Sequence, residues 1–176
     1  MAPIITKYLT EAELPHYYNN ESLSNVVLHF GNKTIFAHKK LLAARGRGSR
    51  VLRNEFKENS PFAKAVEYTI EGHDEEIVEV MIRHIYGFQY DNTLVRRNFD
   101  TELAKTERLE WLISVYLVAV EYRVPSLSIL VTDKLVGMLS EGFHTYRSRH
   151  GDKLNKEQKA RIAESKQVLE RIVALY

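Results

Sequence analysis

The chain has 176 residues, 44% of them hydrophobic and 27% charged, and it carries a formal net charge of +2. This is the composition of an ordinary globular domain with an appendage, and so small a charge does not indicate a nucleic-acid binder. Cysteine is absent, which excludes thiol catalysis, thiolate zinc sites and disulfides and fits a cytoplasmic or nuclear protein. The longest nearly apolar run, residues 111–120, is about half as long as a membrane span, so we expect no membrane partner.

The first 21 residues are predicted to form an N-terminal arm and a short helix. Residues 4–9 are rich in β-forming side chains and suit an extended arm. Thr10 and Glu13 have the spacing of a capping box, which predicts a short helix over residues 10–19 that Pro15 should interrupt.

A β-hairpin is expected next. Val26, Leu28 and Phe30 alternate along one strand and therefore share one face. Residues 31–33 supply a short loop that contains glycine. In the second strand, Phe36 is expected to return an aromatic side chain to the core.

Two helices are predicted to follow the hairpin directly. The first should begin at His38 and stop at Gly46, because two glycines within three residues are unfavourable in a helix. Ser49 should cap the second helix. Leu52 and Phe56 lie four residues apart on the face of that helix that is expected to be buried.

A third strand is predicted at residues 68–70, and Asp74 should cap a third helix after it. The apolar residues of that helix recur at helical spacing and predict its buried stripe: Ile77, Val78, Met81, Ile82 and Ile85. Residues 91–108 are polar and weakly periodic, which indicates a long loop or an irregular helix on the surface.

The last part of the chain is predicted to be helical. Residues 109–122 are apolar almost all round, which is typical of a helix enclosed by others. Pro125 should start the next helix at its favoured first position. An aromatic-bearing stretch follows beyond Gly142, and a basic break is expected at residues 147–152. A final helix is expected over residues 155–176.

Several of these segments together resemble a BTB/POZ domain. Phe36-Ala37-His38-Lys39 is similar to the family's F-x-A-H-K segment, residues 81–86 to its M-L-R-Y-L-Y segment, and residues 112–122 to its L-x-V-Y-x-L-A-x-K-Y segment. The match is most like the small fungal-type members. It implies an α+β fold in which a small mixed sheet is capped by a cluster of helical hairpins, with the domain over residues 22–140 and a C-terminal helical extension over residues 141–176.

The resemblance also implies a function without chemistry: protein–protein interaction, through self-association as a homodimer and through recruitment of other proteins. Asn25 and Lys39 stand where related transcriptional regulators build a charged pocket near the dimer interface. Asn25 replaces the usual aspartate and removes one charge, so we expect a weakly polar pocket that does not bind corepressor-type peptides.

Cullin-type ubiquitin-ligase adaptors of this family carry a hydrophobic residue, any residue and then glutamate in the loop before the third strand. Ser60-Pro61-Phe62 stands at that place and does not match. Phe56-Lys57-Glu58 has the right chemistry four residues earlier. The resemblance therefore makes Phe56, Lys57 and Phe62 the candidate contacts for a cullin scaffold, with Phe62 the favoured anchor.

An alternative function rests on charge. Seven cations fall within nineteen residues against the single acid Glu55, and they are Lys39, Lys40, Arg45, Arg47, Arg50, Arg53 and Lys57. A nucleic-acid-associated regulator could use such a patch to neutralise phosphates, but the segment lacks exposed aromatic stacking partners. A solvated helix face, or a site for an acidic protein, explains the patch better.

No pattern in the chain predicts catalysis, a metal site or a cofactor. The serine-elbow, phosphate-loop and metalloprotease signatures are absent, and the seven histidines are scattered singly. His38 fits a structural role at the start of a helix better than proton transfer. We therefore expect a protein that is not an enzyme.

Overall fold

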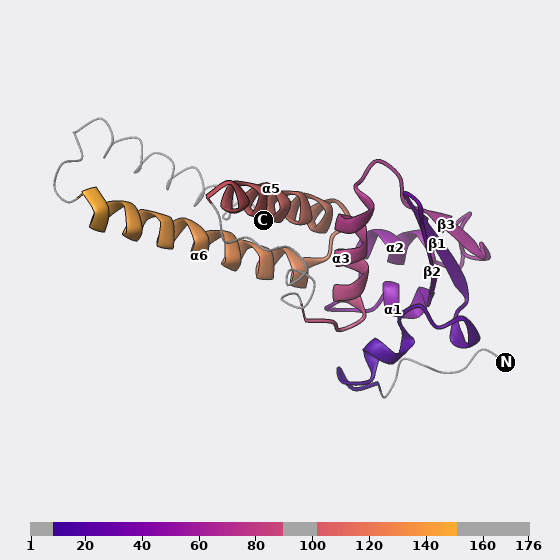
Figure 1. The fold of residues 1–176 in the computed structure, drawn as a ribbon. Coiled ribbons are helices and arrows are strands. Elements are labelled where there is room, and N and C mark those ends of the chain that lie inside the picture. Colours follow the sequence, from indigo (N-terminus) through magenta and orange to yellow (C-terminus); the bar gives the residue numbers. More distant parts are fainter. Residues whose placement is uncertain (1–8, 90–101, 151–176) are drawn as a thin grey trace. The chain divides into compact units, whose positions relative to one another are not determined.

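The computed structural model describes the backbone of residues 9–89 and 102–150 and the side chains of residues 9–89 and 108–138. The chain divides into two compact units, Met1–Val131 and Thr132–Tyr176. Along the chain in Figure 1 the elements are the 3₁₀ turns η1 (Leu14–Tyr17) and η2 (Glu21–Leu23), strands β1 (Val26–Phe30) and β2 (Lys33–Ala37), helices α1 (Lys39–Leu42) and α2 (Arg50–Glu55), strand β3 (Glu67–Thr69), and helices α3 (Glu75–Ile85), α5 (Glu102–Glu121) and α6 (Pro125–His150).

The three strands form the predicted small mixed sheet, in the order β2-β1-β3. β1 is antiparallel to β2 across the hairpin and parallel to β3. A parallel neighbour needs a crossover connection, which α1 and α2 provide. The α+β class expected from the sequence is therefore confirmed.

Alternation decides which side of the hairpin is buried. The β1 residues Leu28 and Val26 lie opposite Ile35 and Ala37 of β2, and all four are at most 6% exposed. Phe36 points to the other face and is only half-buried, so the prediction that it fills the core was wrong. The reason is the pleat: the face that holds Ile35 and Ala37 cannot also hold the residue between them.

The first helix after the hairpin is shorter than predicted. α1 ends at Leu42, four residues before Gly46. The Arg53 guanidinium then satisfies the carbonyls of Ala43 and Ala44, at 2.7 Å each, and these groups take no part in a longer helix. α2 begins as predicted, with the Ser49 side chain accepting from the Leu52 amide at 3.0 Å.

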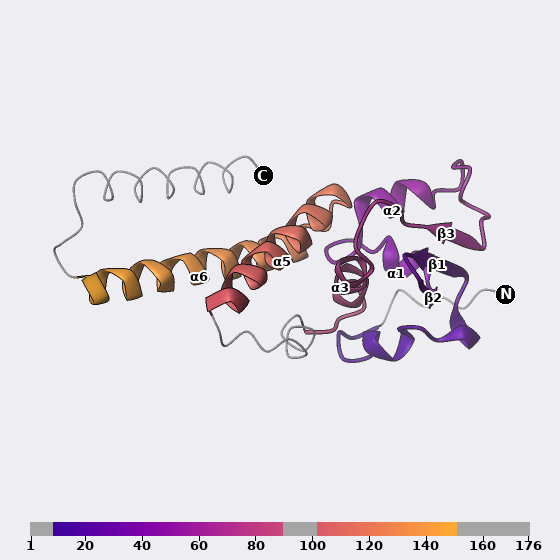
Figure 2. The ribbon, with the colours of Figure 1, turned by 45° about the horizontal axis from the view of Figure 1, so that its top comes forward.

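Helix α3 is the central helix of the first unit. Asp74 caps it as predicted by accepting from the Glu76 amide at 2.8 Å. Gly87, at φ +80°, closes its C-terminus in the left-handed conformation that lets the Phe88 amide bond back to the Arg83 carbonyl. In both Figure 1 and Figure 2, α3 lies between the sheet and α5.

The core joins these layers. All five residues of the predicted α3 stripe are buried, at 4% exposure or less. The largest fully buried side chains come from the sheet and from every helix of the first unit, and they are Phe30, Leu28, Leu42, Leu52, Ile70, Met81, Ile82, Ile85, Tyr86, Leu112, Leu127 and Val26.

Helices α5 and α6 differ from the sequence expectations. α5 already includes residues 102–108, which were expected to be irregular, and it leaves Ile113 and Leu117 exposed although the sequence predicted an enclosed helix. α6 starts at Pro125 as predicted and continues through Gly142 and into the expected basic break, as far as His150. One glycine costs a helix only about 1 kcal/mol relative to alanine, too little to end so long a helix.

Some predictions lie outside the described residues: most of the arm at residues 4–9, the loop at residues 91–101 and the helix at residues 155–176. The predicted boundaries at residues 22 and 141 stay predictions. Within the described residues no helix combines the length and the apolar character that a bilayer crossing requires.

Candidate partner-binding surface

Three aromatic side chains gather at the β3 edge of the sheet, and we call them the aromatic cluster: Phe56, Phe62 and Tyr68. Tyr68 lies in the middle of the edge strand β3, and each phenylalanine ring packs edge-on against it at 5.4 Å between centroids. Phe62 is 41% exposed, whereas Phe56 and Tyr68 are half-buried. The cluster therefore presents one aromatic ring to solvent and supports it with two others.

The loop that carries Phe62 is held in place by local hydrogen bonds. The Ser60 hydroxyl accepts from the Phe62 amide at 3.0 Å and donates to the Glu55 carbonyl. Two further turns follow, in which Ala63 bonds to Ser60 and Ala65 bonds to Phe62. These bonds fold the segment between the end of α2 and the start of β3 into successive turns.

Lys39 ties this loop to the start of α1. Its ammonium group donates to the carbonyls of Ala63, at 2.7 Å, and Phe62, at 3.3 Å, and lies 5.3 Å from the centre of the Phe56 ring. Burial lowers the pKa of the Lys39 ammonium. Burial, with a smaller effect of the Glu55 carboxylate, raises the pKa of the Tyr68 phenol. Lys39 thus holds the exposed ring of Phe62 through the backbone beneath it.

The structure brings together four of the five residues predicted to bind partners. Asn25 joins the group because its side-chain oxygen accepts from the Lys39 amide at 2.9 Å. Lys57 is exposed, and no described contact links its side chain to the cluster. Sequence reasoning missed Tyr68 as a site residue, although an aromatic between the exposed Glu67 and Thr69 of a short strand was an available signal.

The Asn25–Lys39 pair also bears on the expected pocket. Asn25 receives the backbone amide of Lys39, and the ammonium group is directed to two carbonyls rather than to a carboxylate. The weakly polar pocket itself stays a prediction, as does the absence of corepressor-peptide binding.

The predicted basic patch is divided by the fold. The charged groups of Lys39 and Arg53 donate hydrogen bonds to backbone carbonyls. Arg47 donates to the His84 carbonyl at 3.3 Å and to the Glu11 carboxylate at 2.9 Å. The four other cations of the patch are exposed: Lys40, Arg45, Arg50 and Lys57. The interpretation as a solvated face therefore holds for four of the seven cations, and nucleic acid would meet a weaker patch than the sequence indicates.

His38 lies at the N-cap of α1 and is almost completely buried, at 2% exposure. Its Nδ1 atom lies 3.0 Å from the Tyr86 hydroxyl, which also accepts from the His38 amide at 2.8 Å. Burial lowers the pKa of the imidazole. The neutral ring joins the hairpin to the end of α3, which is a structural role. Among the described residues, no group of three or more histidine or carboxylate side chains is arranged to hold a metal ion.

Comparison with known proteins gives two findings. A family model described as "BTB/POZ domain" matches residues 14–137. A solved structure, the BTB (Tramtrack and Bric a brac) domain of human Gigaxonin, is 21% identical, and the match covers 65% of this chain and 80% of that chain with a TM-score of 0.46. The comparison with curated proteins gave no match.

Proposed function

The chain belongs to the BTB/POZ domain family, whose members are protein–protein interaction modules, and we propose that it recruits a protein partner through the aromatic cluster without doing any chemistry itself. The observation that carries the proposal is the exposed ring of Phe62, supported by Tyr68 and held by Lys39. Exposed aromatic residues in well-packed surroundings are the side chains that most often dominate interface energies.

Preorganisation favours this surface. A partner that binds a mobile loop must compensate the lost conformational entropy of that loop. Here the Ser60 hydroxyl and the Lys39 ammonium already fix the backbone on both sides of the Phe62 ring. Most of the ordering cost is therefore met during folding, before a partner arrives.

The finer proposal is that the partner is a cullin scaffold, so that the chain acts as a ubiquitin-ligase adaptor, and that Phe62 is its anchor. Phe62 lies in the loop before β3, where the family resemblance places cullin contacts. Phe56 is the poorer anchor, because its ring is half-buried between Tyr68 and the Lys39 ammonium. Support for the cullin comes from this location alone, since Ser60-Pro61-Phe62 lacks the glutamate of the family's adaptor pattern and Phe56-Lys57-Glu58 carries it four residues earlier.

Calorimetry with a cullin N-terminal domain tests both parts. We expect wild type to bind and Phe62→Ala to weaken binding by about 2 kcal/mol, roughly thirtyfold in Kd. Ile129→Ala is the matched control, because Ile129 is 63% exposed and lies on α6 outside the cluster. Tight binding that Phe62→Ala leaves unchanged would refute the anchor. No binding by wild type would remove the adaptor role and leave the aromatic cluster as a site for another protein.

A further inference from the structure

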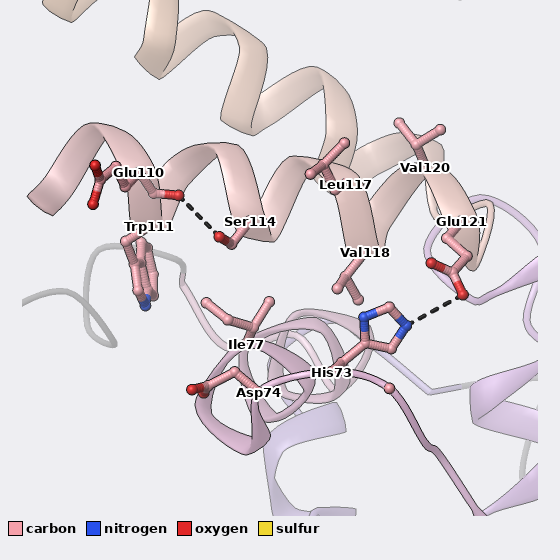
Figure 3. A pocket seen from close by; sticks show the side chains of 11 residues that line it. His73, Asp74, Ile77, Glu110, Trp111, Ser114, Leu117, Val118, Val120 and Glu121 are labelled. Atoms are coloured by element: carbon pink, nitrogen blue, oxygen red, sulfur yellow. Dashed lines mark hydrogen bonds and ion pairs between the residues drawn. The ribbon is translucent and has the colours of Figure 1, made fainter.

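A second surface lies along α5, away from the aromatic cluster, and we call it the α5 groove. It is a groove of 760 Å³ between α5 and the turn that leads into α3. Figure 3 shows its floor, where Trp111 and Val118 of α5 face Ile77 of α3. These three side chains are 9%, 3% and 4% exposed, so the floor is apolar and already packed.

One lip of the groove is apolar and open to solvent. Leu117 lines the groove and is 59% exposed, and Ile113, one helical turn before it, is 43% exposed. A helix that is apolar all round is normally enclosed by other helices. Among the residues that the structure describes, none encloses the side of α5 that carries Ile113 and Leu117. An open apolar helix face of this kind is characteristic of a site for another helix.

The rim of the groove is acidic. Glu110 and Glu121 are exposed and stand at its two ends, with Asp74 on the opposite wall. The two glutamates are eleven positions apart in α5, which places them about 16 Å apart along the helix axis. Among the described residues that line the groove, His73 is the only basic one, and its Nε2 atom lies 3.2 Å from the Glu121 carboxylate.

We propose that the α5 groove binds an amphipathic helix of a protein partner, with an apolar stripe against Leu117 and the edge of Trp111 and with lysine or arginine near both ends. The open apolar lip supplies the contact area, and the carboxylates at the rim select positive charge. The same carboxylates repel nucleic-acid phosphates and anionic lipid headgroups. Two basic residues about three turns apart on the partner helix would meet Glu110 and Glu121.

Trp111 makes the test direct, because it is the single tryptophan of the chain and lines the groove. The probe is a synthetic helical peptide of about 18 residues, or five turns, with leucines at helical spacing and lysines flanking them. A control peptide keeps the leucines and replaces each lysine with glutamate. Titrated into the full chain, the lysine peptide should change the Trp111 emission to saturation, and the glutamate peptide should not.

Two variants locate the binding. Leu117→Glu places a charge on the apolar lip and should weaken the lysine peptide at least about tenfold in Kd. Ile129→Glu is the matched control, since it adds the same charge to an equally exposed apolar position on α6, and it should leave Kd unchanged. Both variants should melt at the temperature of wild type, because both positions face solvent.

Several results would overturn the proposal. They are equal binding of the two peptides, binding that Leu117→Glu does not weaken, or no emission change up to about 1 mM lysine peptide. A dimer in light scattering that Leu117→Glu dissociates would assign the groove to a second copy of the chain. A melting temperature lowered in Leu117→Glu but not in Ile129→Glu would show that the chain itself covers the lip.

Discussion

At the scale of single residues, the Ser49 side chain connects two parts of the first unit. Its hydroxyl accepts from the Leu52 amide at 3.0 Å, which caps α2, and donates to the Tyr122 carbonyl at 2.6 Å, at the end of α5. The side chain is completely buried. A buried polar group that serves as donor and acceptor at once is expensive to remove, because both partners lose their bonds away from water.

We therefore expect Ser49→Ala to lower the free energy of unfolding by about 2 kcal/mol, from the lost cap and from the Tyr122 carbonyl, which would keep only its longer bond from the Val51 amide, at 3.4 Å. Urea denaturation measures this change. Ser114→Ala is the control, because Ser114 is exposed and bonds only to the Glu110 carbonyl in its own helix. Equal effects of the two substitutions would contradict the role assigned to Ser49.

The second residue of this kind is His84, which is buried in α3 with Nε2 2.8 Å from the Ser126 hydroxyl. Burial, and secondarily the positive charge of Arg47, lowers the pKa of His84 to about 4. In the unfolded chain its pKa is about 6.5, so the unfolded state takes up the proton first as the pH falls. The contribution of the neutral His84 side chain to the free energy of unfolding is therefore complete above about pH 6.5, and it is lost between there and about pH 4.

Between pH 7 and pH 4 we expect this group to account for a loss of roughly 3 kcal/mol in the free energy of unfolding. His84→Gln should be less stable than wild type at pH 7 and should show a shallower fall with pH. Unfolding curves at several pH values give both slopes. Ser126→Ala is the control, because it leaves the burial of His84 and the nearby Arg47 in place, and it should keep the wild-type slope. Parallel pH curves for wild type and His84→Gln would exclude His84 as a source of the dependence.

At the scale of elements, the hairpin turn is packed onto the start of α3. The Asn32 amide donates to the Glu75 carboxylate at 2.8 Å. Gly31 has φ +54°, and a Cβ atom built there would lie 2.8 Å from the Glu75 Cβ. That atom is next to the helix backbone and cannot easily move aside. The turn and the helix therefore fit together only when residue 31 has no side chain.

Gly31→Ala should consequently destabilise the protein by about 2–3 kcal/mol, from the left-handed backbone and the contact with Glu75 together. Gly72→Ala separates the two causes, since Gly72 has φ +81° but open space around it. It should cost only the backbone term, about 1 kcal/mol. Thermal melts of both variants measure the difference. If Gly31→Ala lowers the stability no more than Gly72→Ala does, the contact with Glu75 of α3 does not exclude a side chain at position 31.

At the scale of the whole molecule, the main expectation is self-association. It rests on the family resemblance and on the arm predicted at residues 4–9, which could pair across a two-fold axis. We expect light scattering at tens of micromolar to give twice the monomer mass. Deletion of residues 1–9 should shift the protein toward monomer without lowering its melting temperature. A monomeric mass for the full chain at that concentration would end the hypothesis.

Much of the first unit follows from local signals. The alternation of Val26, Leu28 and Phe30, the caps at Ser49 and Asp74 and the start of α6 at Pro125 were all predicted, because each depends on residues a few positions apart. The helix ends were predicted less well. The Arg53 guanidinium that satisfies the carbonyls after α1 approaches from ten residues away, so no local pattern encodes it.

The sequence by itself determined the fold class, the family and most of the candidate site, down to the identity of Asn25, Lys39, Phe56 and Phe62. Only the tertiary structure decided how those residues act together. The Lys39 ammonium reaches a carbonyl 24 positions along the chain, and Tyr68 enters between two phenylalanines that the sequence places six residues apart. The tertiary structure also decided which side of α5 is exposed to solvent. Periodicity reports the apolar faces of a helix, but whether a face is covered depends on the packing of distant segments.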